Sequence, residues 1–140
     1  MECALKFGEL KEGESIVVGK AELKDAYDSL DAVERGTIER VAARIKTFAE
    51  AQRASLREMT VPIPGGEAGH TVAPVDVAGC YAPGGRYPLP SSVLMTAVTA
   101  RAAGCKSVIV ATPKPLKVTL AAAHARRGVV VRCHAILTSA

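Results

Sequence analysis

Aromatic side chains, long apolar runs and closely spaced metal ligands are all scarce in this sequence. Its 140 residues include no tryptophan and only 4% aromatic residues, which leaves few surfaces on which nucleobases could stack. No stretch approaches the roughly 20 consecutive apolar residues that a transmembrane helix needs. Residues 1–8 lack the basic and then apolar segments of a secretory signal. We therefore expect a cytoplasmic protein with no membrane partner.

The cysteines are widely spaced, and neither Cys-x-x-Cys nor His-x-x-x-His occurs. Without a secretory signal, Cys3, Cys80, Cys105 and Cys133 are expected to be reduced thiols. Cys80 and Cys105 each follow a glycine beside an apolar run, which predicts that they lie in the core. Cys133 and His134 are adjacent, whereas the ligands of structural zinc sites usually come as spaced pairs. We therefore expect no metal-binding residue in this chain.

Acidic residues are absent from the second half of the chain. Residues 1–76 contain 10 Lys/Arg and all 14 Asp/Glu, a net charge of −4, whereas residues 77–140 contain 8 Lys/Arg and no acid, a net charge of +8. A basic half is one feature of nucleic-acid-binding proteins. Here the basic residues are scattered among apolar runs and form no large cluster. A nucleic-acid partner is therefore the least favoured of the functions considered.

The first part of the chain has helical periodicity. Residues 21–30 predict a short helix, and Asp31 with Glu34 three residues later has the pattern of a capping box. A longer helix follows, with one apolar stripe that is expected to face the core or another subunit. The stripe consists of Ile38, Val41, Ile45, Phe48 and Leu56.

Prolines and glycines then interrupt the helical pattern. The residues 62–69 predict a loop or a hairpin corner, and they lack the Gly-Lys-Ser/Thr of a phosphate-binding loop. Residues 70–75 alternate enough to predict a strand. The apolar run at 129–131 matches no element that we can assign.

Short apolar runs alternate with helical patterns after residue 76. Strands are predicted at 77–81 and 107–111, and helices from about residue 90 and from Thr119. Ser91 or Ser92 is the expected N-cap of the first of these helices, and Gly104 its C-cap. The order predicts a parallel sheet with right-handed crossovers. The fold class is therefore α/β, with a mainly helical N-terminal arm at 1–58 and an incomplete Rossmann-like layer at 59–140.

The turn that follows the strand at 77–81 is the candidate binding site. Ligands of open α/β sheets bind where strands end, and a helix that starts near Ser91 would point its positive end towards the same region. Tyr81 offers a flat face for an adenine or nicotinamide ring and a hydroxyl donor, and the Pro83-Gly84-Gly85 backbone allows close approach. On its own, such a turn more often only reverses the chain. Ser91 and Ser92 have no identifiable His or acid partner that would make them nucleophiles.

Several segments together resemble the histidinol dehydrogenase family in order and spacing. They are the residues 74–85 (PVDVAGCYAPGG), 87–95 (YPLPSSVLM), 100–104 (ARAAG) and 108–113 (VIVATP). The residues 32–52 also look like the N-terminal helices of that family, and the resemblance extends over roughly residues 21–123. The loop at 65–71 and the turn at 85–88 are similar to a branch that includes alcohol dehydrogenases with other substrates.

The resemblance implies an NAD-dependent oxidoreductase of histidine biosynthesis. The family oxidises L-histidinol, or a related alcohol, to the acid in two steps with a bound zinc and a Glu-His pair, and it implies a homodimer. Tyr81 matches the tyrosine that contacts NAD in the family, with Pro83, Gly84 and Gly85 as secondary contacts. The family's zinc ligands, Glu-His pair and substrate residues have no counterpart here, so no catalytic residue is assigned.

The resemblance ends near residue 125. The family continues from its Leu-Ala-Ala-Ala helix into a Gly-Gly-Ala-Gln segment, which this chain lacks. We expect a chain that is truncated or frame-shifted after about residue 125, is inactive by itself, has an atypical tail from about 126 and lacks the next strand of its sheet. The alternative is a non-catalytic product that binds a nucleotide weakly or pairs with a full-length relative.

Overall fold

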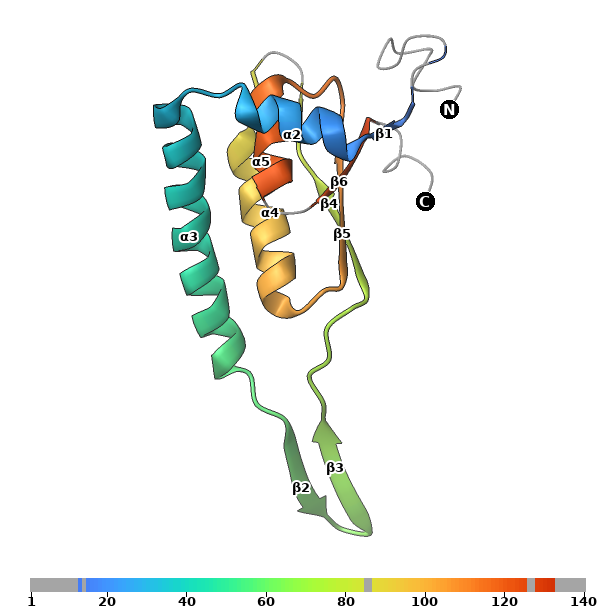
Figure 1. Cartoon of the computed structure of the whole chain (residues 1–140). Coiled ribbons are helices and arrows are strands. Elements are labelled where there is room, and N and C mark those ends of the chain that lie inside the picture. Colours follow the sequence, from blue (N-terminus) through green and yellow to red (C-terminus); the bar gives the residue numbers. More distant parts are fainter. Residues whose placement is uncertain (1–12, 14, 85–86, 126–127, 133–140) are drawn as a thin grey trace.

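The computed structural model describes residues 13, 15–84, 87–125 and 128–132 (Figure 1). From residue 77 to residue 125, its helices and strands follow the order that the sequence predicts. In chain order they are β1 (Val17–Val18), α2 (Lys20–Asp28), α3 (Ala32–Ser55), β2 (Met59–Ile63), β3 (Gly66–His70), β4 (Val77–Tyr81), α4 (Pro90–Ala103), β5 (Ser107–Thr112), α5 (Lys117–Ala125) and β6 (Val129–Arg132).

The main sheet has four strands in the order β1-β6-β5-β4. The strands β4, β5 and β6 are parallel, and β1 pairs antiparallel with β6. One row across the sheet joins Cys80, Val110, Val130 and Val18. The predicted α/β class and the predicted parallel pairing are therefore confirmed.

The core lies between this sheet and helices on one of its sides. Figure 1 shows α4 and α5 against the sheet, with α2 packed on α5 and the long helix α3 outside α4. Val93, Val108, Val110 and Val130 are almost completely enclosed there. Cys80 and Cys105 are buried thiols, as the sequence predicts. The other side of the sheet presents apolar residues that remain exposed, among them Val77 and Val129.

The helix α3 begins as expected but packs through a different set of residues. The Asp31 side chain accepts a hydrogen bond of 2.8 Å from the Glu34 amide, and Glu34 accepts one of 3.2 Å from the Asp31 amide, so the predicted capping box is confirmed. The predicted stripe is wrong beyond its first half, because Phe48 is 67% and Leu56 60% exposed. Ala49 is buried instead. One residue turns a helix by about 100°, so the burial of Ala49 directs its neighbour Phe48 away from the core.

The residues 59–70 form an antiparallel hairpin, and the strand predicted at 70–75 is wrong. The strands β2 and β3 pair from Met59 opposite His70 to Ile63 opposite Gly66, and Gly65 has φ 89° in the turn. Every residue of both strands is exposed, and the hairpin extends away from the helices (Figure 1). Pro62 has no amide hydrogen for a sheet, but it lies on a strand with one neighbour only, where a proline is tolerated.

The strand β6 corrects our expectation that the sheet lacks its next strand. The Gly128 amide bonds to the Ala123 carbonyl at the end of α5, and the chain then runs beside β5. Val130 buries its side chain at 1% exposure, which explains why the unassigned apolar run joins the sheet. Arg126, Arg127 and the predicted atypical tail from Cys133 on lie outside the described residues.

Candidate functional site

Tyr81 is the last residue of β4 and lies at the carboxyl edge of the parallel strands. It is half-buried and pairs with Ala111 of β5. Because Cys80 faces the core and side chains alternate along a strand, Tyr81 lies on the side of the sheet opposite the helices. The Ala82 amide donates a further hydrogen bond of 2.9 Å to the Ala111 carbonyl, so the strand leads directly into the predicted turn.

The described part of this turn lies against the chain that leaves β5. A Cβ built on Gly84 would be 2.2 Å from the Pro113 carbonyl oxygen. The absence of a side chain at Gly84 therefore lets the ends of β4 and β5 approach each other. Pro83 is exposed beside it, and Gly85, the remaining predicted contact, lies outside the described residues.

The first turn of α4 follows this turn but is not capped as the sequence predicts. The N-cap is Leu89, with φ −120° and ψ 68°, and no side chain caps the helix. Pro90 takes the first helical position, where its missing amide hydrogen is harmless. This starts the helix one residue before Ser91, and Ser91 and Ser92 therefore lie within its first turn. The predicted C-cap is confirmed, since Gly104 is left-handed with φ 101°.

Sequence reasoning missed two residues at the end of β5. Thr112 is 1% exposed, and its hydroxyl has no hydrogen-bond partner within the described part of the chain. Lys114, two residues later, is exposed and has φ 43°, a left-handed conformation that few residues other than glycine adopt. The signal that could have revealed them is their position just after a buried parallel strand, where ligands of such sheets bind.

The histidines of the described chain have structural partners. The His70 Nε2 lies 2.9 Å from the Arg57 carbonyl oxygen, beside the hairpin. His124 is half-buried, and its ring centroid is 5.3 Å from that of Tyr27. No group of three or more His, Cys, Asp or Glu side chains comes together among the described residues. The chain as described thus presents no donor set of the kind that holds zinc.

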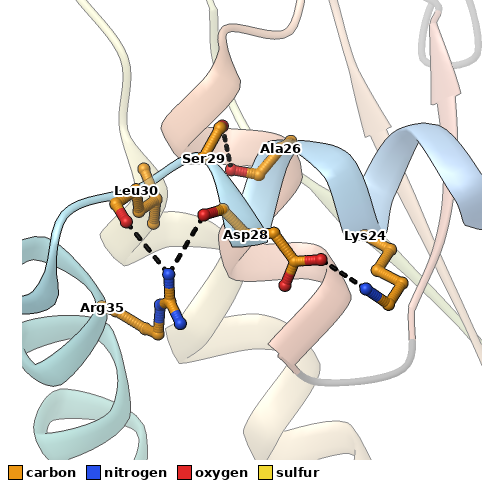
Figure 2. A network of polar contacts seen from close by, with 6 residues as sticks. All are labelled: Lys24, Ala26, Asp28, Ser29, Leu30 and Arg35. Carbon is orange, nitrogen blue, oxygen red and sulfur yellow. Dashed lines mark hydrogen bonds and ion pairs between the residues drawn. The ribbon is translucent and has the colours of Figure 1, made fainter.

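Two charged side chains on α2 shift each other's pKa, far from the turn in sequence. Lys24 donates a hydrogen bond to Asp28, and this bond holds the pKa of the Asp28 carboxyl below its ordinary value, against the opposing effect of desolvation. The same bond raises the pKa of Lys24. Figure 2 shows that Arg35 of α3 also donates to the Asp28 and Leu30 carbonyl oxygens, at 3.1 Å each. The hydrogen bonds of Arg35 join α3 to the end of α2, and the Lys24–Asp28 bond lies within α2. All of them stabilise the scaffold.

Three of the cavities formed by the described residues lie elsewhere, and none of these three has a described lining residue in the turn at 81–84. One of about 910 Å³ lies between α3 and α4 beside Lys46 and Arg101. Another of about 540 Å³ lies between Leu56, Pro74 and Cys105, and a third of about 560 Å³ beside Val17 and His124. None of these cavities lies at the edge where parallel strands end beside the start of a helix, so their volumes do not identify a ligand site.

No described helix is both long and apolar enough to cross a membrane.

Comparison with known proteins decides the family. A sequence model described as histidinol dehydrogenase matches residues 1–132. This chain belongs to the histidinol dehydrogenase family. The match confirms the resemblance and extends it in both directions, including past residue 125, where we expected the resemblance to end.

Curated relatives of this family member carry two kinds of name. The chain is 43% identical over 95 residues to "Histidinol dehydrogenase homolog 1" of Mesorhizobium japonicum, covering 67% of this chain and 19% of that protein. It is 42% identical over 96 residues to histidinol dehydrogenase of Methanococcus maripaludis, covering 69% and 23%. It is also 36% identical over 100 residues to sulfopropanediol 3-dehydrogenase of Ruegeria pomeroyi, covering 71% and 23%. The matched region thus makes up 19–23% of each of these relatives.

A solved structure has the same fold over most of this chain. The crystal structure of histidinol dehydrogenase from Elizabethkingia anophelis superposes with a TM-score of 0.70 and 24% sequence identity. The superposition covers 85% of this chain and 29% of that one. At this identity the likeness concerns the fold alone.

Proposed function

We propose that this chain is the part of an NAD- and zinc-dependent alcohol dehydrogenase that contacts the cofactor through the turn at 81–84. The observation that carries the proposal is the position of Tyr81 at the carboxyl edge of β4 and β5, where open α/β sheets bind their ligands. The whole enzyme would oxidise L-histidinol, or a related alcohol, to the acid. NAD accepts hydride in such reactions.

The role that we assign to this chain is binding and not chemistry. Tyr81 would stack on the adenine or nicotinamide ring, while Pro83, Gly84 and Gly85 would let the backbone approach it. Zinc polarises an alcohol oxygen in enzymes of this kind, but the described residues hold no matching set of ligands. We therefore assign no step through zinc to this chain and propose that it is inactive by itself.

The substrate and the partner are part of the same proposal. The relative from Ruegeria pomeroyi is named for a sulfonated diol, which favours keeping a related alcohol as an alternative to L-histidinol.

A second copy of the chain would form a homodimer in the cytoplasm. Parallel sheets are normally covered on both sides, and the exposed Val77 and Val129 give this sheet an apolar surface to bury. Sedimentation equilibrium tests this. A chain that is still monomeric at about 100 μM, where a dimer with a Kd in the micromolar range would form, contradicts it.

A second candidate is a non-catalytic product that pairs with a longer relative. It is favoured by one observation, namely that the matched region makes up only 19–23% of the curated relatives. Co-purification with a full-length relative, with restored or reduced turnover, would support this function over independent cofactor binding.

Titration of the chain with NAD, followed by NMR, tests the principal proposal. We expect weak binding that shifts the amides around Tyr81, and about fivefold weaker binding by Tyr81→Ala, because an aromatic stacking contact contributes about 1 kcal/mol. Tyr81→Phe is the matched control, since it retains the ring and should bind within about twofold of the parent chain. Equal binding by the alanine variant, or no binding by the parent chain, would overturn the proposal.

A further inference from the structure

We infer that Thr112 is a ligand-binding residue whose hydroxyl donates a hydrogen bond to a phosphate oxygen of a nucleotide at the turn at 81–84. This inference rests on the proposed function and adds to it a residue and the part of the ligand that the residue recognises. It is carried by the environment of Thr112, by its position and by the charge of the surrounding chain.

The environment of Thr112 is unfavourable for a hydroxyl group without a partner. Its side chain is 1% exposed, and its Oγ1 atom makes no hydrogen bond within the described chain. A buried hydroxyl group left unsatisfied destabilises a fold, and most such groups in native proteins have a partner. The buried positions before it on the same strand are Val108 and Val110. Valine has the shape of threonine without the polar atom, so packing alone gives no reason for a hydroxyl at 112.

The position of Thr112 places it at the edge of the sheet where the candidate turn begins. Its side chain lies on the helix side, like those of Val108 and Val110, whereas Tyr81 lies on the other side, so the nucleotide would span the edge between them. Thr112 ends β5 and follows Ala111. Ala111 pairs with Tyr81, and its carbonyl oxygen accepts a hydrogen bond from the Ala82 amide. On its other side, Pro113 lies against Gly84. Thr112 is thus flanked by the two contacts that join β5 to the turn. Thr112 is enclosed in the free chain. The nucleotide would therefore reach its hydroxyl from the sheet edge by separating Gly84 from Pro113, a contact to which the glycine contributes backbone atoms only.

The charge around the end of β5 favours an anionic ligand. The first turn of α4 has no side-chain cap, and uncapped amides at the start of a helix bind phosphate groups readily. Lys114 is exposed two residues after Thr112, and no residue from 77 to 140 is acidic. A hydroxyl donor, helix amides and a cation together match a phosphate group better than they match a neutral sugar.

Two substitutions at this position test the inference in the full 140-residue chain. Thr112→Val removes the hydroxyl and preserves the shape, whereas Thr112→Ser preserves the hydroxyl. The probes are NAD, AMP and adenosine, the last of which lacks phosphate. We expect Thr112→Val to bind NAD and AMP about tenfold more weakly, as for a lost hydrogen bond to a charged group. Thr112→Ser should bind within about twofold of the parent, and adenosine should bind the parent and both variants alike.

Urea unfolding of the same variants separates a ligand contact from an internal one. If the hydroxyl has no partner in the free protein, Thr112→Val should be at least as stable as the parent chain. A less stable valine variant would show that the hydroxyl bonds inside the fold, to a buried water for example, and would overturn the inference. So would unchanged AMP binding by this variant, or an equal loss for adenosine. Those results leave the Tyr81 proposal standing, whereas a parent chain that binds neither NAD nor AMP overturns both.

Discussion

Gly84 lies against Pro113, and a Cβ on Gly84 would be 2.2 Å from the Pro113 carbonyl oxygen. This contact joins the turn after β4 to the turn after β5 at the edge of the sheet where Tyr81 ends its strand. A backbone atom offers no rotamer that could relieve the overlap. The close approach of the two strand ends therefore depends on the missing side chain.

We expect Gly84→Ala to destabilise the chain, because the added methyl group forces the two turns apart. Overpacking of this kind typically costs about 1–3 kcal/mol, measurable as a lower urea midpoint. Gly79→Ala is the matched control, since a Cβ on this strand residue would meet nothing within 4 Å, and it should change stability by less than about 0.5 kcal/mol. Equal effects of the two substitutions would show that the contact with Pro113 does not constrain the turn.

The capping box of α3 gives a second prediction. Asp31→Ala removes the acceptor of the Glu34 amide and should lower the free energy of unfolding by about 1 kcal/mol. Ser91→Ala at the start of α4 should have an effect of less than about 0.5 kcal/mol, because no side chain caps that helix. Thermal unfolding of both variants compares the two helices directly. A larger loss of stability for Ser91→Ala than for Asp31→Ala would indicate that a serine caps α4, as the sequence predicts.

The Lys24–Asp28 pair predicts a dependence of stability on pH. The pKa of Asp28 is lowered in the folded chain, chiefly by the hydrogen bond from Lys24, so the unfolded chain binds a proton more readily. The stabilisation is therefore complete above the ordinary pKa of 3.8 and is lost as the pH falls through the lower folded value. The melting temperature of the parent chain should exceed that of Asp28→Asn at pH 6, and the difference should shrink as the pH falls below 3.8 and through the lower folded value.

The control for this pair is Lys24→Met, which removes the donor and keeps most of the side-chain length (Figure 2). Its melting temperature should also fall below that of the parent at pH 6 and approach it in acid. Both side chains are exposed, so salt should reduce the difference at pH 6. A difference that persists undiminished near pH 2 would assign the stabilisation to something other than the Asp28 carboxylate.

The last prediction concerns the reaction itself. The purified chain should contain no stoichiometric zinc and should form no NADH from NAD and L-histidinol. The described residues hold no cluster of metal ligands, and general acid–base catalysis, which typically contributes about 10²–10⁴-fold, has no assigned residues here. Metal analysis after gel filtration and absorbance at the NADH band measure both. One tightly bound zinc per chain, or sustained turnover, would contradict the assignment of a binding role alone.

The candidate site was predictable from the sequence only in part. The order of strand, turn and helix around Tyr81 follows from local pattern, but its role as an NAD contact comes from family resemblance and remains a proposal. The N-cap of α4 could not be chosen reliably, because Pro90 competes with two serines for the start of the helix. The position of Thr112 at the end of an apolar run is visible in the sequence, but the burial of its hydroxyl is not, since it depends on elements distant in the chain.

Local chemistry is what the sequence by itself determined. The capping box needs only Asp31 and Glu34, and the end of α4 needs only the left-handed conformation of Gly104. Tertiary structure decided which face of α3 is buried, so that Ala49 packs inside while Phe48 remains exposed. It also placed β6 beside β5 and brought β1 from the opposite end of the chain to β6. Interactions within one helical turn depend on neighbouring residues alone, whereas burial and strand pairing depend on which distant segments come together.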